Sequence, residues 1–75
     1  MGVVDAKTKE LVGIAAAVAG HCQKCFAYHY GVAKRIGVDE ADIKEAIELA
    51  KAIRAAGDQG MDEFVRQTMS QGEAT

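Results

Sequence analysis

Glycine placement and the absence of proline constrain the fold of this chain more than any other feature of its sequence. Gly20, Gly37 and Gly57 each follow a segment in which apolar residues recur at three- and four-residue spacing. Glycine is favoured just after a helix because it adopts the left-handed conformation at little cost. No segment of useful length alternates polar and apolar residues, as a strand would. The pattern predicts an all-α fold.

We expect an antiparallel bundle of about four helices in a single domain covering residues 1–75. Abundant alanine and the lack of proline both favour helix. The first predicted helix runs from the N-cap Asp5 to Ala19, and the second from about His21 or Cys22 to Ile36. The third runs from Asp39 to Ala56. The last covers Met61–Met69 and is followed by a frayed tail at 70–75.

The short chain predicts that this domain associates with further copies of itself. At 75 residues, a domain buries only about 60% of the surface that its unfolded chain exposes, so an isolated copy is marginally stable. The apolar face of the last helix, which contains Met61, Phe64, Val65 and Met69, is expected to join the core or an interface. We therefore expect a homo-oligomer.

Charge and hydropathy exclude several functions. The net charge of −2 comes from interspersed acids and bases, without the basic stripe that nucleic-acid binding requires. The apolar runs are much shorter than the roughly 20 residues that span a bilayer, so no membrane association is expected. No flavin, haem or nucleotide motif is present, which predicts no bound cofactor. These observations predict a cytoplasmic protein, whose cysteines are catalytic or metal-binding rather than a permanent structural bridge.

The stretch "GHCQKCFAYHYG" contains both cysteines and both histidines of the chain. Cys22 and Cys25 are three residues apart on the first turn of the predicted second helix, close enough to form a disulfide. The helix dipole and unpaired N–H groups at this end stabilise a thiolate. His29 lies one turn after Cys25 on the same face, where its imidazole can accept or return the thiol proton.

Local spacing leaves three interpretations open. The cysteines could form a redox dithiol, they could be small buried side chains, or they could bind zinc together with His29 and either His21 or Glu10. A histidine that acts as a base usually has a third group to hold it, and Glu10 is the candidate because a hairpin at Gly20 would place the first helix beside the second. Glu10 is roughly 18 Å of helix from Cys22, so it can approach the His29 end.

Glu10, eleven intervening residues, then Cys22-x-x-Cys25-x-x-x-His29 resembles the active-site signature of the alkylhydroperoxidase D-like (AhpD-like) branch of the carboxymuconolactone decarboxylase family. The resemblance covers about residues 5 to 57. It implies an AhpD-like helical fold and a dithiol that reduces hydroperoxides, with Cys25 as the peroxidatic thiol and Cys22 as the resolving thiol. It also implies that Glu10 and His29 form a proton relay to the thiols.

The resemblance implies an external reductant, because the disulfide must be reduced after each turnover; we expect a lipoyl-type or thioredoxin-like dithiol. Lys24 stands where the best-characterised peroxidases of this branch have histidine. An alternative function with the same cysteines is therefore a general disulfide oxidoreductase, in which Cys22 would attack first because it is nearest the helix N-terminus. A zinc-binding or structural oligomeric protein is the other alternative.

Overall fold

The computed structural model describes residues 5–57 and 60–74. These residues form four α-helices and no strand, which confirms the all-α fold class: α1 (Ala6–Ala19), α2 (Gln23–Arg35), α3 (Glu40–Ala56) and α4 (Met61–Ala74). Asp5 and Asp39 are the N-caps of α1 and α3, as predicted. In the described ranges, no helix combines the length and apolar character needed to cross a bilayer.

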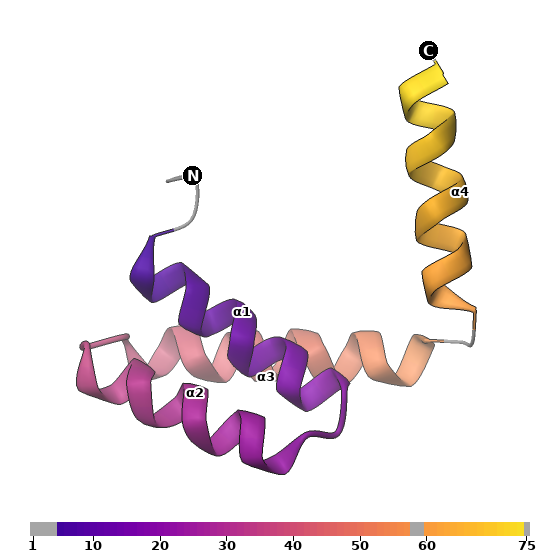
Figure 1. Cartoon of the computed structure of the whole chain (residues 1–75). Coiled ribbons are helices and arrows are strands. Elements are labelled where there is room, and N and C mark those ends of the chain that lie inside the picture. Colours follow the sequence, from indigo (N-terminus) through magenta and orange to yellow (C-terminus); the bar gives the residue numbers. More distant parts are fainter. Residues whose placement is uncertain (1–4, 58–59, 75) are drawn as a thin grey trace.

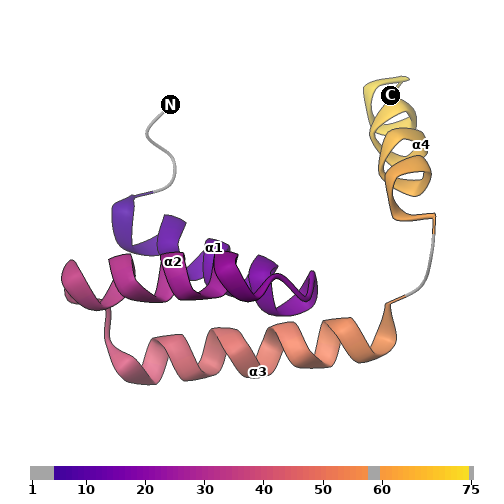
Figure 2. The same cartoon turned by 60° about the horizontal axis from the view of Figure 1, so that its bottom comes forward.

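Helix α1 is the centre of the packed part of the molecule, because it contacts both α2 and α3. It runs antiparallel to α2, and Figure 2 shows these two helices on the same side of α3. Between the three helices lies a small core of buried side chains: Ile14, Ala33, Val38 and Ile43. Leu11, Phe26, Tyr30 and Ile47 pack against this core. The hairpin therefore holds the signature residues of α1 and α2 against each other.

The turns after α1 and α2 have the same hydrogen-bond pattern but different residues at the left-handed position. After α1, His21 N–H donates to Val18 O and Cys22 N–H donates to Ala17 O. This is a Schellman motif, and its left-handed residue is His21, with φ 58°. The prediction that Gly20 would supply that conformation is corrected, because the glycine is the C-cap itself, with φ −91°. The helix ends at Ala19, as predicted, and the left-handed residue is one position later than the sequence suggested.

The motif after α2 places Gly37 at the left-handed position, with φ 85°, as expected. Gly57, in contrast, has φ −70° and ψ 155° and is extended. The chain leaves α3 without a left-handed turn, so the assumption that all three glycines act alike holds only for Gly37. Helix α2 itself begins at Gln23, because Cys22 is the N-cap.

Helix α4 projects away from the other three helices (Figure 1). It continues to Ala74, whereas the sequence predicted an end near Met69 and a frayed tail; Thr75 lies outside the described residues. The predicted apolar face is present but does not join the core of this chain. Its side chains are largely exposed: Met61, Phe64, Val65 and Met69.

Candidate functional site

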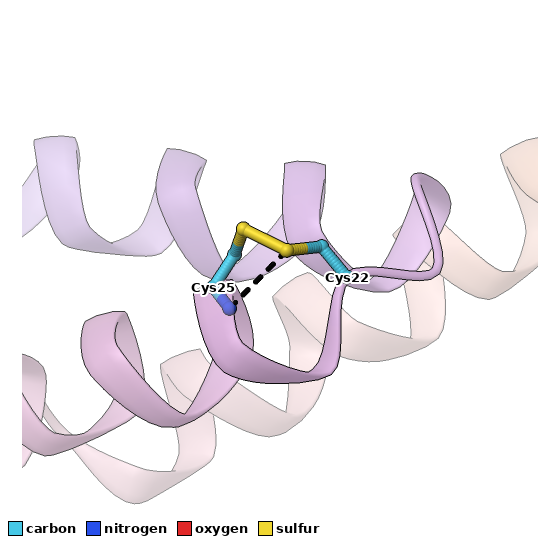
Figure 3. Close-up of a disulfide and its surroundings, with 2 residues drawn as sticks. All are labelled: Cys22 and Cys25. Carbon is cyan, nitrogen blue, oxygen red and sulfur yellow. Dashed lines mark hydrogen bonds between the residues drawn. A yellow bond between two sulfur atoms is a disulfide. The ribbon is translucent and has the colours of Figure 1, made fainter.

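Cys22 lies in the turn between α1 and α2, where it is the N-cap of α2. Its backbone N–H donates to Ala17 O in α1, and its Sγ accepts the backbone N–H of Cys25 at 3.3 Å (Figure 3). The two cysteines form a disulfide across the first turn of α2, with Cα atoms 5.2 Å apart. Both side chains are partly buried. The predicted proximity of the cysteines is thus confirmed.

Glu10 and His29 are brought together across the α1–α2 contact. The Nδ1 atom of His29 and Oε1 of Glu10 are 2.7 Å apart, which is a short hydrogen bond. Glu10 is the one buried charged residue in the described part of the chain, at 8% exposure. A carboxylate taken out of water is costly unless it has such a partner. When the imidazole is neutral and its proton is on Nδ1, this N–H donates a hydrogen bond to Glu10, and Nε2 can accept another proton.

Gly13 makes room for this histidine. Gly13 is three residues after Glu10 on α1 and therefore lies on the same helix face. A Cβ at this position would be 2.6 Å from both Cγ and Nδ1 of the His29 ring. From the α2 side, the ring of Tyr28 meets the imidazole edge-on, with centroids 5.0 Å apart. The imidazole is thus held by a carboxylate, a glycine backbone and an aromatic edge.

The described residues show no hydrogen bond between His29 and either sulfur. The four predicted site residues therefore form two pairs, Glu10 with His29 and Cys22 with Cys25, on neighbouring turns of α2. In the oxidised state shown here the sulfurs carry no proton, so there is none for the imidazole to accept. No group of three or more His, Cys, Asp or Glu side chains in the described part of the chain is arranged to hold a metal ion.

The sequence model of the carboxymuconolactone decarboxylase family matches residues 2–61. The chain belongs to this family. The match includes all four signature residues and ends at the first residue of α4, so it covers the packed helices. It does not specify the AhpD-like branch, with which the dithiol signature is consistent. Searches of curated proteins and of solved structures found no match.

In this family member, an open pocket of about 340 Å³ adjoins the disulfide. It is lined by Ala17, Val18, His21, Cys22, Gln23, Phe26 and Arg54. Arg54 comes from the last turn of α3, and its Nη1 donates to Val18 O at 3.0 Å. Sequence reasoning missed Arg54 and Gly13. Neither residue belongs to a local motif, and only the packing of α1 against its neighbours reveals them. The family match and the disulfide together fit a redox role.

Proposed function

We propose that the chain reduces hydroperoxides with the Cys22–Cys25 dithiol, and that an external dithiol restores the reduced enzyme. The observation that carries this proposal is the Glu10–His29 hydrogen bond of 2.7 Å, one helical turn from a closed disulfide. A base that is held by a carboxylate and shares a helix face with a thiol is the arrangement that activates a nucleophile. The family match supports the same chemistry.

In the proposed reaction, the Cys25 thiolate attacks the terminal oxygen of the hydroperoxide and breaks the O–O bond. Cys25 becomes a sulfenic acid, and the alkoxide that leaves takes a proton from His29, giving an alcohol. The Cys22 thiol then attacks the Cys25 sulfur, so that the disulfide forms and water leaves. Two electrons have passed from the dithiol to the peroxide. Glu10 stabilises the imidazolium that exists between these proton transfers.

The disulfide is then reduced by thiol–disulfide exchange. A lipoyl-type or thioredoxin-like dithiol supplies two electrons and becomes a disulfide itself, while Cys22 and Cys25 return to thiols. Such a reductant is available in the reducing cytoplasm, where we place the reaction. The function needs no bound cofactor, because the electrons enter and leave through sulfur.

A second candidate is a general disulfide oxidoreductase, in which Cys22 is the attacking thiol. One observation favours it: Cys22 Sγ is the N-cap of α2 and accepts the Cys25 N–H. A hydrogen bond from a helix N-terminus stabilises negative charge on sulfur, which would favour Cys22 as the thiolate after reduction. The two candidates thus differ in which sulfur attacks and in which substrate is consumed.

Single cysteine variants separate these candidates. We expect Cys25→Ser to abolish hydroperoxide consumption, and Cys22→Ser to leave a sulfenic acid on Cys25 that a dimedone-type reagent traps. Each variant controls for the other, because both remove one thiol and the disulfide. If the wild type reduces protein disulfides but not hydroperoxides, and Cys25→Ser accumulates a mixed disulfide with the substrate on Cys22 whereas Cys22→Ser forms none, the second candidate is correct. Stoichiometric zinc that protects both thiols from alkylation, in protein purified without chelator, would contradict both redox functions.

We also propose that the working form is a homo-oligomer. The packed part of the chain buries few large side chains, with Ile14 and Ile43 the largest that are fully buried. The apolar face of α4 remains exposed in a single copy. A second copy that covers this face would add the apolar burial that a chain of this length lacks.

A further inference from the structure

An open pocket between α1, α2 and the end of α3 adjoins the disulfide. Cys22 is among the residues that line this pocket, and Cys25 is not. Phe26 supplies an apolar wall, and Ala17 and Val18 form the wall on α1. The volume of about 340 Å³ is at the lower end of the range for small-molecule sites. A small thiol that enters here meets the Cys22 sulfur first.

The charge of the pocket is positive. Arg54 is the only lysine or arginine in its lining, and the lining contains no carboxylate. One N–H of the guanidinium is used on Val18 O, and in residues 5–57 and 60–74 Arg54 has no acidic partner. A guanidinium has five N–H donors, so the remaining donors are available to an anion.

That hydrogen bond ties Arg54 to α1. Val18 is in the last turn of α1, where its carbonyl also accepts the N–H of His21 and lies at the negative end of the helix dipole. Arg54 thus joins the end of α3 to the end of α1, beside the turn that presents Cys22. A cation held next to a reactive disulfide can select the substrate as well as stabilise the fold.

We propose that this pocket binds a small thiol that carries an anionic group, such as a carboxylate or sulfonate, and that Arg54 binds this group while the thiol reduces the disulfide. The inference rests on the proposed redox function and specifies its electron donor. The donor thiolate attacks Cys22 Sγ, the Cys22–Cys25 bond breaks, and Cys25 leaves as a thiolate. A second donor thiolate, which is on the same molecule when the donor is a dithiol, then attacks the donor sulfur of the mixed disulfide. The donor leaves as its own disulfide, and the dithiol has gained two electrons.

The test compares two thiols of similar shape, 3-mercaptopropionate and the neutral 3-mercaptopropionamide, as reductants of the oxidised protein. Rate constants are compared at equal thiolate concentration, because thiolate is the attacking species. The wild type is expected to prefer the anionic thiol roughly tenfold, as one charge-assisted hydrogen bond would allow. Added salt should reduce this preference. Trapping the released Cys25 with N-ethylmaleimide should place the donor on Cys22 in the mixed disulfide.

Three variants identify the source of the preference. Arg54→Gln should abolish it, and Arg54→Lys should retain part of it. Arg35→Gln is the matched control, because it removes the same charge from an exposed residue outside the pocket and should leave the preference intact. Helical circular dichroism shows whether each variant folds. If Arg54→Gln does not fold, the comparison of the two thiols on the wild type still tests the proposal.

The outcomes separate this inference from the function on which it rests. Equal rates for both thiols in the wild type, a preference that survives Arg54→Gln, or a donor attached to Cys25 would each overturn the anionic-donor site while leaving the dithiol chemistry in place. If neither thiol reduces the disulfide, and a dithiol reductant also fails, the redox function itself is wrong.

Discussion

The imidazole of His29 lies directly against the backbone of Gly13, in space that any larger residue at that position would occupy. A Cβ there would be 2.6 Å from Cγ of the ring, well inside van der Waals contact. This close approach brings Nδ1 within 2.7 Å of Glu10 Oε1. The hydrogen bond on which the proposed relay depends therefore requires a glycine one turn away from the carboxylate.

Replacement of Gly13 by alanine tests that dependence. In a helix interior, alanine is normally favoured over glycine by about 1 kcal/mol. We expect Gly31→Ala to show this gain, because a Cβ on Gly31 would contact nothing within 4 Å. Gly13→Ala should not be stabilised in this way, because the His29 ring must move away from Glu10 to make room for the new Cβ. Urea unfolding measures both free energies, and equal stabilisation by the two substitutions would show that His29 is not held by this contact.

His21 and Gly37 occupy equivalent left-handed positions, with φ 58° and φ 85°. A residue with a Cβ pays about 1 kcal/mol or more for this conformation. His21→Gly should therefore stabilise the fold by about 1 kcal/mol, and Gly37→Ala should destabilise it by a similar amount. Thermal unfolding of both variants checks this prediction. If both substitutions raised the unfolding temperature, or both lowered it, backbone conformation at these two positions would not determine the change in stability.

Self-association through α4 is the next prediction. Phe64 is 63% exposed and lies on the apolar face of that helix. We expect the wild type to show a concentration-dependent mass in sedimentation experiments, and Phe64→Asp to shift it towards the monomer. Ser70→Asp adds the same charge outside the apolar face and should leave the mass unchanged. A wild type that stays monomeric at every concentration tested would refute the proposed homo-oligomer.

Asp5 gives a pH dependence to the start of α1. The backbone N–H of Thr8 donates to its carboxylate at 2.8 Å, and this bond holds the pKa of Asp5 below its usual value. A lowered pKa in the folded state contributes stability above the usual carboxyl pKa, and this contribution is lost as the pH falls through the folded-state value. Asp5→Asn retains an acceptor without a titrating charge. Its unfolding midpoint should therefore fall less than that of the wild type between about pH 6 and about pH 2; parallel curves would contradict this role for Asp5.

Much of the site could be predicted because its residues follow helical spacing. The hairpin at Gly20 and the distance along α1 allowed Glu10 to approach the His29 end, the family resemblance favoured their pairing, and the structure shows them in contact. The disulfide follows from the three-residue spacing of Cys22 and Cys25 on a helix start. These relationships are local, or depend on one antiparallel helix contact.

Other features depend on packing that no short segment specifies. Arg54 is 36 residues from its acceptor Val18, and an arginine in the last turn of a helix usually indicates only a favourable interaction with the dipole. The left-handed residue after α1 was expected to be Gly20, but Gly20 is the C-cap of a helix that ends at Ala19, and His21, one position later, has that conformation. The end of α4 was placed too early because polar residues after Met69 gave no apolar periodicity, although the helix continues.

The pH profile of thiol alkylation in the reduced protein tests the central claim, that the Glu10–His29 pair activates the dithiol. We expect at least one cysteine to react with a midpoint clearly below the unperturbed thiol value of about 8.5. Glu10→Gln should raise this midpoint by about one pH unit, whereas Glu45→Gln, at an exposed position on α3, should not. Both cysteines of the wild type titrating near 8.5, with no change in Glu10→Gln, would contradict it.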